Sequence, residues 1–150
     1  MGGVTMTKED KELLLKDLCA RLPYGVKCNA FLKEIDGSLK SIFGTFKGYN
    51  GWATVGNNLV DIETVRPYLR SMSSMTEEQK KEILKRYKLH TYYGLCIEIT
   101  NHSEGYRDDD NSCNLQDYLW LVDWFNKNHF DYRGLIEKGL AINATGLNIY

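Results

Sequence analysis

The sequence predicts an α+β fold in which a small curled antiparallel sheet, or a partial barrel of SH3-like size, packs against an N-terminal helix and a C-terminal helical pair. Short stretches of alternating apolar and polar residues, separated by glycine-containing turns, occupy 26–62. Helical apolar spacing precedes them in 7–22 and returns in 114–138. A chain of 150 residues has the length of one domain, so we expect 1–150 to fold as a single unit.

The composition is typical of a globular protein. Hydrophobic residues make up 43% of the chain, there are only two prolines, and the net charge is −1, so we expect no general affinity for nucleic acid. The four cysteines are widely spaced and form no CxxC pair, which predicts free thiols. We find no signal-peptide pattern, no long apolar run and no cofactor motif. We therefore expect a cytoplasmic protein without a cofactor and without a membrane segment.

The first helix is expected over 7–22, after a loose lead-in over 1–6. Thr7 followed by Asp10 resembles a capping box, which satisfies the first free N–H groups of a helix. Pro23 would then stop the helix. The apolar residues that would face the core at helical spacing are Leu14, Leu15, Leu18, Cys19 and Leu22.

A meander of short strands is expected over 26–62. Residues 26–33 alternate between apolar and wetter side chains, which is the period of a strand with one buried face. Asp36 followed by Gly37 is a strong hairpin signal. Glycines at 44, 48, 51 and 56 would permit sharp curvature of the sheet.

The middle of the chain changes character at Arg66-Pro67, which we interpret as the end of the strand pattern. A second capping box, at Thr76, begins a helix over 76–88 with a thin apolar stripe, so this helix should lie on the surface. Residues 95–100 alternate cleanly and predict a further strand of the same sheet.

The densest apolar stretch predicts the C-terminal helical pair over 114–138. A long helix over 115–130 is followed by a break at which Asp131 could cap a short helix over 132–138. Gly139 suits the position just after a helix end. The short helix would fold back against the long one.

Two tryptophans, Trp120 and Trp124, fall on the side of the long helix opposite its main apolar side. One reading is that a second layer of the protein covers both indoles, since tryptophan is usually well buried. The other is that they form an aromatic platform for a ligand or partner, because indoles offer large stacking faces.

Arg66 and Arg70 are the candidate residues for binding an anion. Arginine matches the geometry of phosphate through two parallel hydrogen bonds, and the hydroxyl of Ser73 could add a donor. The charged residues that follow in 77–88 are more typical of a solvated helix surface. A nucleotide-binding or small-anion-binding protein that sequesters its ligand is therefore our alternative function.

Catalytic and metal sites have weaker support. A thiol of Cys96 or Cys113 paired with His102 or His129 would suit a small hydrolase, but no nucleophile motif accompanies them. The acidic run 108–111 lacks the spacing of a calcium loop. We name no catalytic residue and no metal ligand, and we expect a binding protein rather than an enzyme.

Aromatic residues provide the compositional hint towards binding, with ten Tyr, five Phe and three Trp. Several lie in or near predicted turns, where tyrosine and tryptophan suit recognition surfaces: Tyr24, Tyr49, Trp52, Tyr92 and Tyr93. Our leading hypothesis is a non-enzymatic binding module whose partner is another protein, or a second copy in a homodimer.

Three stretches carry a family resemblance: KDLCARLPYGVK at 16–27, RPYLRSMSSMTEEQKKE at 66–82 and HFDYRGLIEKGLA at 129–141. They resemble a family of small, functionally unassigned proteins encoded by gut anaerobic bacteria, their prophages and phages. The resemblance implies a cytosolic accessory protein that is phage-related, and it transfers no catalytic residue. Binding of a host protein or of a signalling nucleotide is the analogy it suggests.

Overall fold

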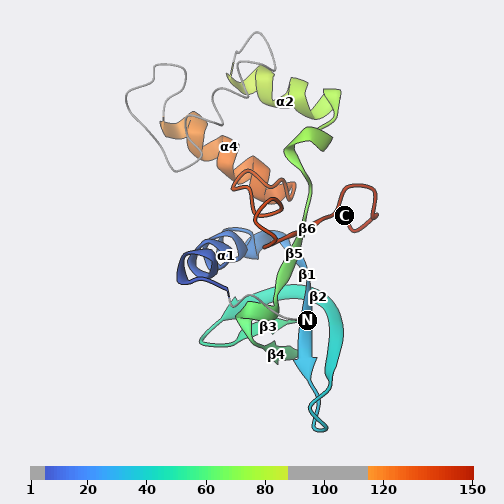
Figure 1. Cartoon of the computed structure of the whole chain (residues 1–150). Helices are drawn as coiled ribbons and strands as arrows, with labels where there is room; N and C mark the ends of the chain where they lie inside the picture. The colour runs from blue at the N-terminus through green and yellow to red at the C-terminus, as the bar shows by residue number, and fades with distance from the viewer. Residues whose placement is uncertain (1–5, 88–114) are drawn as a thin grey trace.

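A computed structural model describes residues 6–87 and 115–150 (Figure 1). The helices are α1 (Lys8–Ala20), α2 (Glu77–Tyr87) and α4 (Leu115–Lys127), with short 3-10 helices η1 (Leu22–Tyr24), η2 (Ile62–Thr64) and η3 (Met72–Ser74). The strands are β1 (Lys27–Lys33), β2 (Leu39–Tyr49), β3 (Ala53–Val55), β4 (Asn58–Val60), β5 (Arg66–Leu69) and β6 (Ile142–Asn143). The expected 95–100 strand and nearly all of the 1–6 lead-in lie outside the described residues.

The described strands form one mixed sheet in the order β4-β3-β2-β1-β5-β6. Strands β1 to β4 are the antiparallel meander expected for 26–62, and β5 and β6 extend it, with β6 parallel to β5. Together with the helices, this sheet confirms the α+β class. The described strands do not close into a barrel.

The sheet curls where β2 crosses the turn between β3 and β4. A Cβ atom on Gly44 would lie 2.9 Å from the backbone N of Gly56, so only glycine permits this approach. The Gly56 N–H donates to the Thr45 carbonyl at 2.9 Å, and the β2–β3 register shifts between Phe46 and Gly48. This curvature brings β4 close to the end of β1, and Figure 1 shows the tip of the β1–β2 hairpin projecting beyond them.

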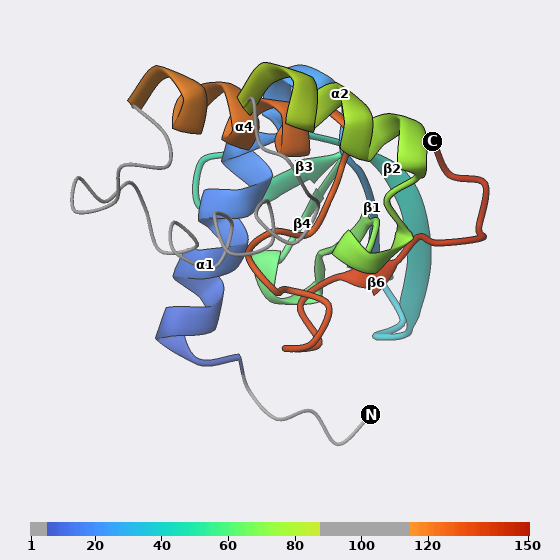
Figure 2. The same ribbon diagram turned by 90° about the horizontal axis from the view of Figure 1, so that it is seen from above.

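Two hydrophobic cores hold the fold together. The first lies between the sheet and α1, and among its fully buried residues are Leu14, Leu18, Val26, Cys28, Ala30 and Val65. The second joins α2 and α4, which lie side by side in Figure 2, to the loop that follows α4. Its buried residues are Met75, Ile83, Leu121, Trp124, Phe125 and Phe130.

A buried ion network joins the two cores. Asp17 and Arg21 of α1 are both fully buried, and the two carboxylate oxygens of Asp17 accept Arg21 Nε at 2.9 Å and Nη2 at 3.1 Å. Arg21 also donates to the carbonyl of Phe130 at 2.6 Å, and Arg133 donates to Asp17 at 3.0 Å. The inner face of α1 is thus partly ionic. Cys19, expected in its core stripe, is exposed.

Strand β5 corrects the prediction that Arg66-Pro67 ends the strand pattern. Pro67 lies opposite Cys28 of β1, whereas pairing with β6 begins one residue later, where Tyr68 lies opposite Ile142. The proline therefore occupies a part of the strand that has a neighbour on one side only. A residue without an N–H is tolerated there.

The C-terminal helical pair is also corrected, because 132–138 forms turns and not a second helix. Gly134 has a φ of +76°, which interrupts the helical path in the middle of this stretch. The carboxylate of Asp131 still caps the following turn, as it accepts the backbone N–H groups of Leu135 at 2.8 Å and Ile136 at 2.9 Å. A capped turn therefore replaces the helix.

Candidate functional site

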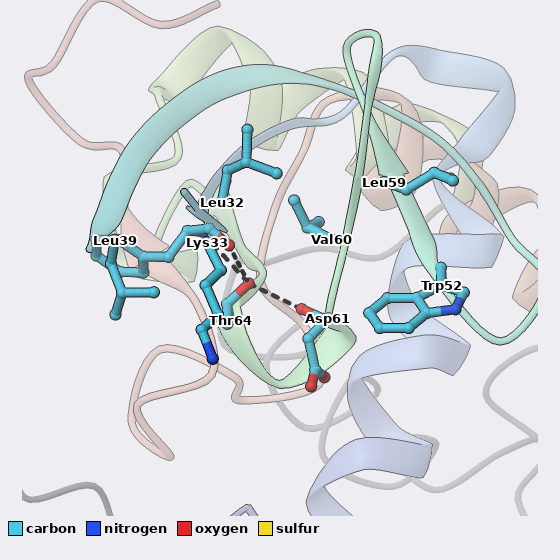
Figure 3. A pocket seen from close by; sticks show the side chains of 9 residues that line it. Leu32, Lys33, Leu39, Trp52, Leu59, Val60, Asp61 and Thr64 are labelled. Atoms are coloured by element: carbon cyan, nitrogen blue, oxygen red, sulfur yellow. Dashed lines mark hydrogen bonds between the residues drawn. The ribbon is translucent and has the colours of Figure 1, made fainter. Parts of the chain in front are cut away.

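An apolar hollow of about 440 Å³ opens between the end of β1 and the β3–β4 hairpin (Figure 3). Apolar side chains form most of its wall, and Lys33, Asp61 and Thr64 supply the polar groups. The complete lining is Phe31, Leu32, Lys33, Leu39, Trp52, Leu59, Val60, Asp61 and Thr64. Its volume is in the lower part of the range that binding pockets occupy.

The register of the β3–β4 hairpin places the indole in this hollow. Ala53 lies opposite Val60, so the next pair outward is Trp52 and Asp61. Because side chains alternate between faces along a strand, Trp52, Leu59 and Asp61 share the outward face while Ala53 and Val60 enter the core. Trp52 is 56% exposed and Leu59 is 60% exposed.

The hydroxyl of Thr64 joins two of the segments that line the hollow. Thr64 accepts the backbone N–H of Phe31 at 3.3 Å and donates to the carbonyl of Asp61 at 2.8 Å (Figure 3). The Asp61 carboxylate caps η2 by accepting the N–H of Glu63 at 2.9 Å. The 3-10 turn is therefore held against the edge of β1, and the hollow is preformed between two tied elements.

The turn between β1 and β2 stands beside the hollow and carries Ile35, whose relative exposure is 106%. Gly37 supplies the positive φ of +86° that the turn needs. The Asp36 carboxylate accepts the Ser38 backbone N–H at 2.9 Å as well as its hydroxyl, and these hydrogen bonds lower the pKa of Asp36. The turn is thus ordered by its own hydrogen bonds, with an apolar side chain at its tip.

Arg66, a predicted anion ligand, makes hydrogen bonds to backbone carbonyls. Its guanidinium donates to the carbonyls of Gly139 at 3.1 Å, Glu63 at 2.9 Å and Val65 at 2.8 Å. Burial lowers the pKa of Arg66, and the nearby charge of Glu63 opposes that shift. This side chain ties η2 and the C-terminal segment to β5.

Arg70 and Ser73 lie apart from Arg66. Arg70 follows Arg66 by four residues along extended chain, which separates their Cα atoms by about 13 Å. Its guanidinium lies over the rings of Phe130 at 6.0 Å and Tyr150 at 5.7 Å, and it makes no hydrogen bond or ion pair with a described residue. Ser73 lines a separate hollow of about 410 Å³ whose charged lining residues are Asp131 and Glu137.

The two helix tryptophans turn towards the core, which corrects the side assigned to them. Trp124 is only 6% exposed and stacks on Phe130 at 5.7 Å, and Trp120 is half-buried against the same cluster. Leu119 of the same helix is 50% exposed. The burial of Trp124 favours the reading in which a second layer covers its indole.

Of the catalytic candidates, only His129 falls within the described residues. It is buried, has a φ of +62° and stacks on Tyr150 with ring centroids 3.7 Å apart. Its Nδ1 atom has no hydrogen-bond partner, and burial, aided by the charges of Arg21 and Arg70, lowers its pKa to about 4. Cys96, Cys113, His102 and the acidic run 108–111 lie outside the described residues.

The part of the chain that the structure describes contains no cluster of three His, Cys, Asp or Glu residues able to hold a metal ion. None of its helices has the length and apolar character needed to cross a bilayer. Comparison with protein-family models, curated proteins and solved structures found no match to this chain.

Among the described residues, the hollow around Trp52 is the best-defined candidate site. Sequence patterning identified Trp52 as an aromatic residue at a turn, but it did not predict which residues would surround it. The short strands expected within 26–62 contain part of that information, because the alternation of side chains along a strand sets which of them share the outward face. The approach of β4 to β1 depends on the curl of the whole sheet.

Proposed function

We propose that this chain is a non-enzymatic binding module that acts through a protein partner and that the hollow around Trp52 is its contact surface. The observation that carries the proposal is a half-exposed indole in an apolar hollow beside Leu39 and Leu59, which are 65% and 60% exposed. Exposed apolar groups clustered around a concavity are typical of interaction sites. Tryptophan is among the residues enriched at such contacts.

The backbone of β4 favours an extended peptide segment as the occupant. In the two-residue β3–β4 hairpin, Val55 and Asn58 exchange ladder hydrogen bonds, so the N–H and C=O of Leu59 point to the free edge. No hydrogen bond from that edge to a described residue is present. A peptide could satisfy these groups while it places an apolar side chain in the hollow.

The test is selection from a displayed random-peptide library with the purified chain as the target. We expect enriched peptides with an apolar or aromatic anchor, and we expect Trp52→Ser to remove their binding in titrations with the synthetic peptides. Leu147→Ser is the matched control, because Leu147 is 50% exposed and does not line the hollow. Peptides that bind the Trp52→Ser protein as tightly as the unaltered protein would contradict the proposal.

A second candidate function, binding of a nucleotide or small anion, is favoured by one observation at Arg70. Its guanidinium lies over two aromatic rings without a counter-charge among the described residues. The test is a thermal-shift screen with nucleotides and inorganic phosphate, repeated on Arg70→Gln and Arg66→Gln. A shift that Arg70→Gln abolishes and Arg66→Gln retains would favour an anion at Arg70.

The family resemblance fits the leading proposal without adding residues to it. A small phage-related accessory protein with one preformed contact surface could act by occupying a segment of another protein. None of the three resembling stretches includes a residue that lines the hollow. The proposal therefore depends on Trp52 and its neighbours alone.

A further inference from the structure

The tip of the β1–β2 hairpin presents an apolar side chain that is fully exposed. Ile35 is 106% exposed, more than any other large apolar residue described. The turn that carries it is held by the Asp36 to Ser38 hydrogen bonds and by Glu34 N–H donating to the Ser38 carbonyl at 2.8 Å. A fully exposed isoleucine on an ordered turn is typical of a residue that contacts another surface.

The hollow lies beside this same hairpin. Lys33 and Leu39, the residues that flank the turn, both line it, and Figure 3 shows them across the hollow from Trp52. An exposed apolar side chain and a receiving cavity therefore belong to the same hairpin, with Ile35 only two residues along the chain from Lys33. An arrangement of this kind is self-complementary under a two-fold rotation, because each copy can present its isoleucine while it receives that of the other.

We propose that two copies of this chain form a symmetric dimer in which Ile35 of each copy inserts into the hollow of the other. This inference rests on the proposed function, since it takes the hollow to be a site for an apolar side chain from a protein. It names a second copy as that protein. The hollow of about 440 Å³ has room for a branched aliphatic side chain together with part of its turn.

Charge on the rim supports this pairing. The turn carries Glu34 and Asp36 on either side of Ile35, and both are exposed. Lys33 stands at the rim of the hollow on the hairpin side, whereas Asp61 lies on the Trp52 side (Figure 3). In a two-fold arrangement the acidic turn of one copy enters beside the Lys33 ammonium of the other, which fixes its orientation.

The experiment measures association by sedimentation and light scattering over a wide range of concentration. We expect a monomer–dimer equilibrium in the unaltered chain. Ile35→Asp and Leu59→Lys should each weaken the dimer by at least about tenfold, because each removes both copies of the apolar contact. Leu147→Asp is the control and should leave the equilibrium unchanged. Circular dichroism of each variant checks that it is folded, and both altered residues are exposed.

Mixing the two weakened variants makes the test specific. A dimer of one Ile35→Asp copy and one Leu59→Lys copy regains one native contact and gains an introduced aspartate beside an introduced lysine. We therefore expect the mixture to associate more tightly than either variant alone. A chain that stays monomeric, a dimer that Ile35→Asp leaves intact, or a mixture no tighter than its components would overturn the dimer. The peptide selection described above would still decide whether the hollow binds protein at all.

Discussion

The side-chain hydroxyl of Tyr150 takes the place of a backbone partner for Lys27, whose N–H it accepts at 3.0 Å. The same hydroxyl donates to the carbonyl of Tyr68 at 2.8 Å. The register of β1 and β5, in which Cys28 lies opposite Pro67, makes Lys27 and Tyr68 the next pair along. A phenol therefore bridges the two strands where their direct pairing stops, and it makes the C-terminal segment part of the sheet.

The first prediction follows from this bridge. Tyr150→Phe leaves the Lys27 N–H and the Tyr68 carbonyl without their partner, and both groups are partly buried. We expect the free energy of unfolding to fall by about 1–3 kcal/mol, the usual cost of unpaired buried polar groups. Denaturant titration measures it, with unchanged m-values indicating that the denatured state is the same.

Tyr24→Phe is the matched control for that substitution. The Tyr24 hydroxyl also donates a hydrogen bond, to the carboxylate of Asp123, but this contact is exposed. Water can replace a partner lost at the surface, so the control should change stability much less. Equal effects of the two substitutions would mean that the Tyr150 hydroxyl does not complete the sheet.

Local sequence signals predicted the elements of the fold more successfully than their contacts. Thr7 and Thr76 do cap α1 and α2, since the Thr7 hydroxyl accepts the Asp10 N–H at 3.0 Å and the Thr76 hydroxyl accepts the Gln79 N–H at 3.2 Å. Gly139 does adopt a positive φ, of +72°, although it follows a turn and not the predicted helix. Such signals depend on residues only three or four positions apart, so they can be recognised from the sequence alone.

The errors arose where distant contacts decide the outcome. Asp17 is buried in α1 beside Arg21, which lies four residues further along the chain, and the distant Arg133 also reaches it. The orientation of Trp124 depends on Phe130 and on the packing of α2, neither of which helical spacing specifies. The hollow likewise requires β4 and β1 to meet, and this depends on the close approach of Gly44 to Gly56.

The second prediction is that His129 lowers the stability of the fold in acid. Burial, with the charges of Arg21 and Arg70, lowers the pKa of His129 from 6.5 to about 4. As pH falls below 6.5, the unfolded chain takes up this proton before the folded chain does, so stability present above pH 6.5 is lost as pH falls towards 4. We expect His129 to contribute a loss of about 2–3 kcal/mol over this interval.

His129→Asn tests this contribution. Asparagine tolerates the φ of +62° at this position better than most residues do and cannot titrate. The free energy of unfolding of this variant should fall less between pH 6.5 and pH 4 than that of the unaltered chain. Burial raises the pKa of Asp131, which acts in the opposite direction, but this residue is present in both proteins. Parallel pH profiles for the two would exclude His129 as the source of acid sensitivity.

The third prediction concerns the buried ion network. Asp17→Asn removes the counter-charge of Arg21, which is fully buried, and of the nearby Arg133. Breaking a buried pair by removing one partner costs about 3–5 kcal/mol, because the remaining charge stays desolvated. Glu12→Gln is the control, since its contact with Lys8 spans 3.9 Å at the surface and should contribute nothing measurable. Thermal or denaturant unfolding compares them.

The last prediction compares Trp124, which is buried, with Trp52, which is exposed. Trp124 is 6% exposed within the α2–α4 core, so Trp124→Ala should destabilise the fold by about 3–5 kcal/mol through the cavity it leaves. Trp52 is 56% exposed, so Trp52→Ala should change stability little while it weakens peptide binding and self-association. If the hollow is the contact surface, Trp124→Ala should lower the free energy of unfolding, whereas Trp52→Ala should lower the binding affinity. Both quantities are measured on both variants. A Trp52→Ala protein that binds normally but unfolds early would instead make Trp52 a structural residue.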